Sequence, residues 1–276
     1  MGNGTCKMQL TPYQIPFYGY QIKTISVKES NAIALSTNGV VFTWGTNSRM
    51  VSNDDSASGF ISSYNPLIVD ELYQHKNVIS NVYCGERFFV VTSHDAYNIL
   101  TWGQWCAYTE YKPRIQRVSG MHLGLSRKIH DISCTDKTTY CLLTSGVIYY
   151  WKNWEEHGQR LPPQTPCQMS SLPFVRSISS GKSHSACIDV HGNVYVWGII
   201  TSPDIINQPN TPLLIGTSNE QTQYTHVKCG NHSLVVLDND KYLHCWGKNT
   251  CNKLSDDNIT VFHQLTKMVD NNRLDF

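Results

Sequence analysis

Alternating apolar and polar residues recur in short stretches along the chain, and the stretches come in pairs. In the clearest pair, Ala186 and Ile188 precede His191-Gly192, and Val194 follows it. A period of two residues predicts a strand with one buried face, and a glycine between two such stretches is typical of a hairpin turn. We therefore expect a β-hairpin here.

This hairpin recurs five times, and a tryptophan marks each copy. The five tryptophans stand 46 to 58 residues apart: Trp44, Trp102, Trp151, Trp197 and Trp246. Each follows an apolar residue by three positions, and four of the five precede a glycine. Units one, three and four carry Gly39, Gly146 and Gly192 in the turn, whereas units two and five carry Tyr97 and Lys241. We expect another type of turn in those two units, because glycine reaches positive φ without strain.

A proline followed by an apolar residue stands at the start of each unit, where it fits the beginning of an outer strand because it cannot donate to a ladder. The units span roughly residues 12–54, 66–110, 113–158, 166–204 and 212–254, and a tail follows at 259–276. Repeats of this length without helical periodicity predict an all-β propeller with five recognisable blades plus a C-terminal partial unit, in a single domain over residues 1–276. A β-sandwich is the alternative, but it does not explain a Trp-Gly pair recurring in register.

The fourth unit closely resembles the repeat of the regulator-of-chromosome-condensation family. The match runs from Ile178 to Ile188, including Gly181 and His184, and continues from His191 to Gly198. The other units keep the spacing and lose motif residues; three of the five lack the histidine. The resemblance covers roughly residues 12–247 and implies a β-propeller. Kelch and tryptophan–aspartate propellers fit less well, because neither a paired glycine nor a Trp-Asp pair recurs.

Members of that family usually have seven blades, so five units leave open how the ring closes. The tail could begin a sixth unit, or it could pair with the first blade and remove exposed strand edges.

Charge and hydropathy narrow the class of partner. The chain has 22 Lys and Arg residues against 21 acidic ones, for a net charge of +1, so no overall field attracts nucleic acid. We find no run of 18 apolar residues and no apolar N-terminal region, so we expect no membrane span and a soluble monomer in the cytoplasm or nucleus.

The cysteines and histidines do not predict a catalytic or metal site. One repeat position is occupied by Cys84, Cys134 and Cys229, and by Ser180 and Val27 in the other two units. We expect this position to hold small, buried side chains, and the three cysteines to be free thiols. A zinc site at Cys229 and His232, with the nearby His244, Cys245 and Cys251, is the alternative, but the repeat already accounts for the first two. His184 occupies the motif position without a triad around it. We predict no enzyme, no metal and no cofactor.

Two long connections are the candidate protein-binding elements, because function in propellers usually lies on loops. The basic connection carries Arg114, Arg117, Arg127 and Lys128, and the loop at residues 46–65 carries Arg49, Asp54 and Asp55. Both equally fit solvated linkers.

The function predicted from the sequence is a protein-interaction module that acts through one propeller face and that a pathogen could encode to engage a host signalling pathway. The alternative is an exchange factor or regulator of a Ran-like small GTPase, which the family resemblance implies. Chromatin association is a weaker third reading, because the charge is neutral and no basic tail is present.

Overall fold

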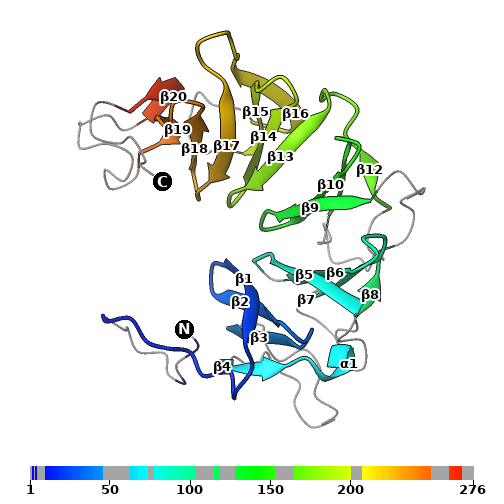
Figure 1. The fold of residues 1–276 in the computed structure, drawn as a ribbon. Helices are drawn as coiled ribbons and strands as arrows, with labels where there is room; N and C mark the ends of the chain where they lie inside the picture. Colours follow the sequence, from blue (N-terminus) through cyan, green and yellow to red (C-terminus); the bar gives the residue numbers. More distant parts are fainter. Residues whose placement is uncertain are drawn as a thin grey trace. The chain divides into compact units, whose positions relative to one another are not determined.

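The computed structural model describes residues 2, 4, 10–45, 63–73, 78–86, 88–103, 115–118, 128–152, 165–199, 207–249 and 261–268 (Figure 1). These residues form five four-stranded antiparallel sheets and one short helix, α1 (Asp70–Tyr73). The all-β class and the five blades predicted from the sequence are therefore confirmed. Within the described part of the chain, no helix is long and apolar enough to cross a bilayer.

Each sheet takes four strands that follow one another in the sequence. The first two sheets contain β1 (Ile22–Lys28), β2 (Asn31–Ser36), β3 (Val41–Gly45) and β4 (Ser63–Ile68), then β5 (Ile79–Cys84), β6 (Phe88–Ser93), β7 (Ile99–Gly103) and β8 (Gln116–Arg117). The third contains β9 (Ile129–Cys134), β10 (Thr138–Leu143), β11 (Ile148–Lys152) and β12 (Cys167–Gln168). The last two contain β13 (Val175–Ser180), β14 (His184–Asp189), β15 (Val194–Ile199) and β16 (Asn207–Gly216), then β17 (Tyr224–Cys229), β18 (Ser233–Asp238), β19 (Leu243–Lys248) and β20 (Val261–Lys267).

The chain divides into two compact units. The first comprises Met1–Lys128, Lys137–Thr139 and Trp151–Pro166 and holds the first two sheets. The second comprises Ile129–Asp136, Tyr140–Tyr150 and Cys167–Phe276, and it holds the fourth and fifth sheets with most of the third.

The outer strand of each sheet comes from the beginning of the next sequence repeat. Pro66 lies in β4, which pairs with β3, and Pro212 lies in β16, which pairs with β15. In the same way, the strand of the C-terminal tail, β20, pairs with β19 and completes the fifth sheet. The sheets are thus offset by one strand from the repeat boundaries drawn on the sequence.

The expectation of a different turn in unit five is wrong. The backbone N–H of Lys241 donates to the Asp238 carbonyl, as that of Gly192 donates to Asp189, and both residues have positive φ, 70° and 87°. Ala96 takes φ 58° in unit two, whose hairpin is longer by one residue because Ser93 bonds to Asn98. Lys241 therefore adopts a backbone conformation that glycine occupies in the turns of units one, three and four.

The core lies between successive sheets of each unit. In the first unit, Ile33 and Leu35 of the first sheet pack against Val82, Phe89 and Trp102 of the second. In the second unit, Ala186 and Ile188 of the fourth sheet pack in the same way against the fifth. All five repeat tryptophans are buried, in agreement with their equivalent positions in the sequence.

Candidate protein-binding surface

The first strand of every sheet carries an apolar residue at one equivalent position, and the exposure of this side chain differs between the first sheet and the others. Ile25 pairs with Ala34, and Val82, Ile178 and Val227 make the equivalent pairs in the second, fourth and fifth sheets. These three residues, and Ile132 in the third sheet, are at most 5% exposed, whereas Ile25 is 48% exposed. The sequence pattern is the same, so the difference must come from what covers each face.

A second position on the same strands shows the same contrast. Cys84 and Cys134 are buried there, and Ser180 and Cys229 are partly buried, but Val27 is 63% exposed. The expectation that this position holds buried side chains is therefore wrong for the first unit. The physical reason lies in the packing within each compact unit. The second, fourth and fifth sheets each pack this face against the preceding sheet, whereas in the first sheet the described contacts on this face come from residues before β1.

The first sheet is instead covered by a segment without regular secondary structure, Tyr13–Tyr20, which we call the strap. Its residues Ile15, Phe17 and Tyr20 pack against the sheet face formed by Ala32, Ala34, Val40, Phe42 and Trp44. The Phe17 ring lies 5.4 Å from that of Phe42 and 5.7 Å from that of Trp44, both edge to face, a favourable aromatic geometry. The strap thus replaces part of the contact that a neighbouring sheet makes elsewhere.

A tight turn joins the strap to the first sheet. The Tyr20 N–H donates to the Phe17 carbonyl at 3.0 Å, and the two residues between them, Tyr18 and Gly19, have φ values of 51° and 87°. Two successive positive φ angles are typical of a type I′ turn, which favours Asn-Gly. Tyr18 is a bulky residue in this conformation, and its side chain is 68% exposed.

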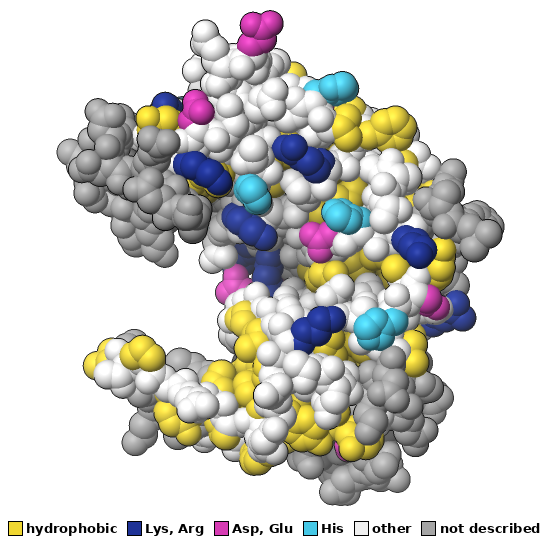
Figure 2. All heavy atoms as spheres, in the orientation of Figure 1, with side chains coloured by type: hydrophobic (Ala, Val, Ile, Leu, Met, Phe, Trp, Pro, Cys, Tyr) yellow, Lys and Arg dark blue, Asp and Glu magenta, His cyan; other side chains and the backbone are white. Residues whose placement is uncertain are grey.

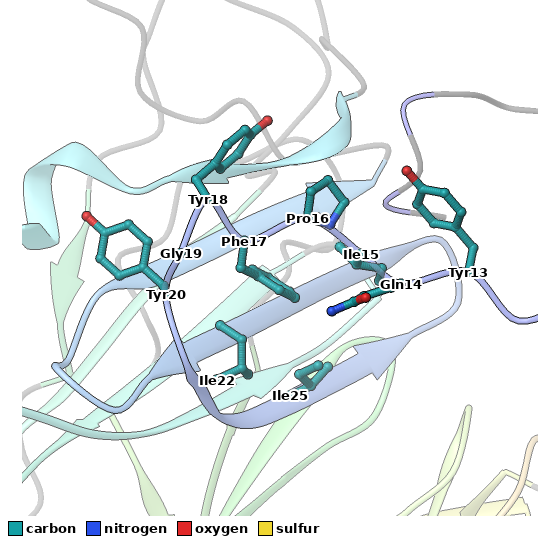
Figure 3. Close-up of a pocket in the computed structure, with 10 residues that line it drawn as sticks. All are labelled: Tyr13, Gln14, Ile15, Pro16, Phe17, Tyr18, Gly19, Tyr20, Ile22 and Ile25. Carbon is teal, nitrogen blue, oxygen red and sulfur yellow. The ribbon is translucent and has the colours of Figure 1, made fainter.

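Between the strap and β1 lies a pocket of about 920 Å³, lined by the strap together with Ile22 and Ile25 (Figure 3). Phe17 and Ile22 point into it, while Tyr13 and Tyr18 point outward (Figure 3). None of the lining residues is acidic or basic, and hydrophobic side chains gather over the same part of the molecule in Figure 2. The neighbouring Tyr73 raises the pKa of Tyr20 above its usual range. We call the strap, Ile25 and Val27 together the open face.

The histidine of the repeat motif has a structural position. His184 is buried, and its Nε2 lies 3.2 Å from the Ser233 carbonyl of the next sheet. Gly181 allows this approach, because a Cβ there would lie 2.1 Å from the Gly230 carbonyl oxygen and 2.4 Å from the His184 ring. In the first unit, Asn31 takes the place of the histidine and donates to the Glu86 carbonyl of the second sheet. This motif position therefore links successive sheets.

The basic connection is only partly described. Arg117 is exposed on β8 opposite Leu100, and Lys128 is exposed with its Nζ 6.0 Å from the centre of the Tyr97 ring. The other candidate residues lie outside the described residues: Arg114, Arg127, Arg49, Asp54 and Asp55. The structure does not test whether these residues form one surface.

The described cysteines are free thiols, as predicted for Cys84, Cys134 and Cys229. Burial raises the pKa of Cys187 and Cys141, and it raises that of Cys245 to about 11. Among the residues with a described position, no group of three His, Cys, Asp or Glu side chains could hold a metal ion. His244 contacts the Asp238 carboxylate at 2.8 Å instead.

The open face was not predicted from the sequence, although one signal was present. Val27 is larger and more apolar than the cysteine or serine at its position in the other units. A larger apolar side chain at a position that otherwise holds small ones indicates that this face is packed differently in the first unit.

No family model matches the chain. It is similar to two curated proteins: the ultraviolet-B receptor UVR8 of Arabidopsis thaliana, 23% identical over 92% of this chain and 59% of the receptor, and protein pim1 of Schizosaccharomyces pombe, 25% identical over 63% of this chain and 36% of pim1. The chain thus spans less than two thirds of either relative.

Solved structures of the yeast protein Prp20 share the fold. Yeast RCC1 (Prp20) bound to Kap60 matches 90% of this chain and 63% of its own, with a TM-score of 0.69 at 15% identity. A second structure of Prp20p, described together with its binding to Gsp1p and histones, matches with a TM-score of 0.64 at 14% identity. At these identities the likeness concerns the fold alone.

Proposed function

Because the chain is a β-propeller of the regulator-of-chromosome-condensation type, we propose that it is a non-catalytic module that binds a partner protein through the open face. Propellers of this type commonly serve in protein interaction and GTPase regulation, and the binding of Gsp1p and histones described for Prp20p is an example. A binding role needs only a complementary patch, whereas catalysis needs a defined constellation of reactive groups.

The exposure of Ile25 is the observation that carries the proposal. Four equivalent residues are buried, so the first sheet offers apolar surface that the rest of the fold consistently covers. Exposed apolar patches beside aromatic side chains are typical of interaction sites. The strap adds exposed tyrosines, and tyrosine is enriched at the centres of protein interfaces.

The test is affinity capture from cytosolic and nuclear extracts with the full chain, comparing wild type with Ile25→Asp. A matched control is Val190→Asp, because Val190 is 53% exposed and lies in the second of the two compact units. We expect a partner that is captured by wild type and by the control but lost with Ile25→Asp. A partner captured equally by all three would reject the open face as the binding surface.

The basic connection remains a second candidate surface, because Arg117 and Lys128 are both exposed and arginine is favoured at interfaces. The combined replacement of Arg114, Arg117, Arg127 and Lys128 by Glu tests it in the same capture experiment. Loss of the partner with this variant alone would assign binding to the basic connection. A host signalling protein is one class of partner that either outcome can identify.

We propose that binding occurs without nucleotide release. An exchange factor must hold a nucleotide-free GTPase by elements of preserved geometry on one face, and three of the five repeats here have lost the motif histidine. Labelled GDP bound to Ran is therefore expected to dissociate at its intrinsic rate when catalytic amounts of this protein are added. Accelerated release would establish the alternative, an exchange factor for a small GTPase.

A further inference from the structure

Three lysines lie at one end of the fourth and fifth sheets, and all three belong to the second compact unit. Lys182 is in the loop after β13, Lys228 is near the end of β17, and Lys248 ends β19. Lys228 is exposed and the other two are half-buried. We call these three residues the basic end. Basic and histidine side chains gather in Figure 2 where β13 and β17 end.

Backbone contacts bring the segments of the basic end together. A Cβ on Gly181 would lie 2.1 Å from the Gly230 carbonyl oxygen, so the loops after β13 and β17 are in contact. The backbone N–H of Lys248 donates to the His232 carbonyl at 2.9 Å. The loop at 230–232 thus touches the segments that carry Lys182 and Lys248, and it begins two residues after Lys228. The three lysines therefore belong to one surface.

The repeat itself does not require a lysine at any of these positions. The positions equivalent to Lys182 hold an acid or an amide in the other four units: Glu29, Glu86, Asp136 and Asn231. The positions equivalent to Lys228 and Lys248 hold uncharged residues: Ser26, Tyr83, Ser133 and Ser179, and Thr46, Gln104, Asn153 and Ile199. Because the other units fold without a base here, the positive charge is a particular feature of the fourth and fifth units.

The acids of the same two sheets lie at the opposite end of the strands. The described ones are in or beside the hairpin turns and the connection before β17: Asp189, Glu220, Asp238 and Asp240. Among the residues described at the basic end of these two sheets, none is acidic. The neighbouring loop of the third sheet contributes Asp136, whose backbone N–H donates to the Lys182 carbonyl at 2.9 Å. The positive charge is therefore concentrated at the end of the fourth and fifth sheets.

Neighbouring sheets do not cover this end. Successive sheets of a propeller pack face to face around the ring, as the fourth packs against the fifth. The strand ends and their loops consequently stay on the surface, whatever number of sheets the ring contains. The basic end is therefore accessible to a partner on the evidence of the second unit alone.

We propose that the basic end binds an acidic segment of a partner protein, whose Asp or Glu carboxylates pair with Lys182, Lys228 and Lys248. Opposite charges on two surfaces accelerate association and select the partner. Nucleic acid fits less well, because its binding depends on many phosphate contacts and the whole chain carries a net charge of only +1. The inference goes beyond the proposed function, since the open face lies in the other compact unit.

The test is fluorescence anisotropy of a labelled peptide of alternating Glu and Gly, titrated with the full chain at low salt. We expect saturable binding that weakens as salt is added, because salt screens exposed charges, and no binding of the same peptide with Gln in place of Glu. Lys228→Glu should weaken binding about tenfold. The control is Lys241→Glu, which makes the same change of charge at an exposed hairpin residue of the fifth sheet and should change affinity by less than about twofold.

Two further variants separate charge from folding. Lys228→Arg keeps the charge and should retain the affinity, whereas Lys228→Gln should lose part of it without adding a repulsive group. Absence of saturable binding to the Glu peptide, equal losses for Lys228→Glu and Lys241→Glu, or a loss with Lys228→Arg as large as with Lys228→Glu would overturn the inference. Tighter binding of a single-stranded oligonucleotide with the same number of charges would also overturn it, because nucleic acid would then be the preferred occupant.

Discussion

The first and the fifth sheets have the same pattern on their first strands, but they bury it differently. Ile25 in β1 and Val227 in β17 make equivalent pairs with their second strands, yet 48% of Ile25 is exposed and only 4% of Val227. Val227 packs against the fourth sheet, whereas Ile25 lies beside the edge of the strap. The alternation in a strand thus specifies which face is apolar, and the neighbouring element decides whether that face is buried or available for binding.

A charge placed at the two equivalent positions should show the largest difference. Val227→Asp is expected to lower the free energy of unfolding by about 4 kcal/mol, because it buries a carboxylate without a partner. Ile25→Asp should lower it by less than about 1 kcal/mol, because the carboxylate stays in water. Urea unfolding followed by tryptophan fluorescence measures both. Equal losses would mean that Ile25 is buried in solution.

Two equivalent glycines should differ for the same reason. A Cβ on Gly181 would lie 2.1 Å from the carbonyl oxygen of Gly230 in the next sheet, whereas a Cβ on Gly230 would meet nothing nearer than the Ser233 Oγ at 3.4 Å. Gly181→Ala is therefore expected to cost about 2–3 kcal/mol of unfolding free energy, and Gly230→Ala less than about 0.5 kcal/mol. The same urea titration tests this pair, and a large loss for Gly230→Ala would indicate an additional contact beyond the fifth sheet.

The strap should contribute less than a complete neighbouring sheet. Phe17→Ala removes two edge-to-face contacts from a partly buried ring, and we expect a loss of about 1–2 kcal/mol. The exposed Leu10 supplies the control, because Leu10→Ala should change stability by less than about 0.5 kcal/mol. Limited proteolysis should cut the Phe17→Ala strap faster than the wild-type strap. An unchanged cleavage rate would show that Phe17 does not hold the strap in place.

The smallest expected effect is a gain in stability at the hairpin of the fifth sheet. Lys241 has φ 70° where Gly39 has φ 83° in the first sheet. Lys241→Gly should stabilise the protein by about 0.5 kcal/mol, because relief of the left-handed strain exceeds the entropy cost of glycine. Asp240→Gly is the control, and its lower stability in thermal denaturation would exclude a general benefit of glycine in this turn.

The repeated part of the fold follows from the sequence because it depends on local signals. The hairpins, the buried tryptophans and the free thiols come from alternation, spacing and register, and these signals are complete within one unit. The turn at Lys241 was not predicted, because a lysine can occupy the left-handed region at a modest energetic cost that the rest of the fold offsets. The assignment of the outer strands to the preceding sheets was missed because the proline marks a strand without indicating which sheet it joins.

The candidate site was not predicted because it depends on how far the apolar residues of β1 are exposed, and the sequence alone does not show this. The sequence shows that Val27 is larger than the cysteine or serine at its position in the other units, but only the structure shows that it is 63% exposed where Cys84 is buried. Arg117 and Lys128 were predicted because function in propellers usually lies on polar loops, and both are exposed. The open face carries no charged side chain and so lacks that signal. Apolar binding surfaces resemble core positions in sequence, so they become visible only when burial is known.

Site-specific photo-crosslinking tests the central claim most directly. Benzoylphenylalanine placed at Val27, which is 63% exposed, samples the open face. The same group at Val190, which is 53% exposed, samples a valine of the second compact unit. After irradiation in cell extract, the account predicts a discrete adduct of one partner protein from position 27 that is absent from position 190. Adducts of the same partner from position 190 alone, or the same adducts from both positions, would contradict it.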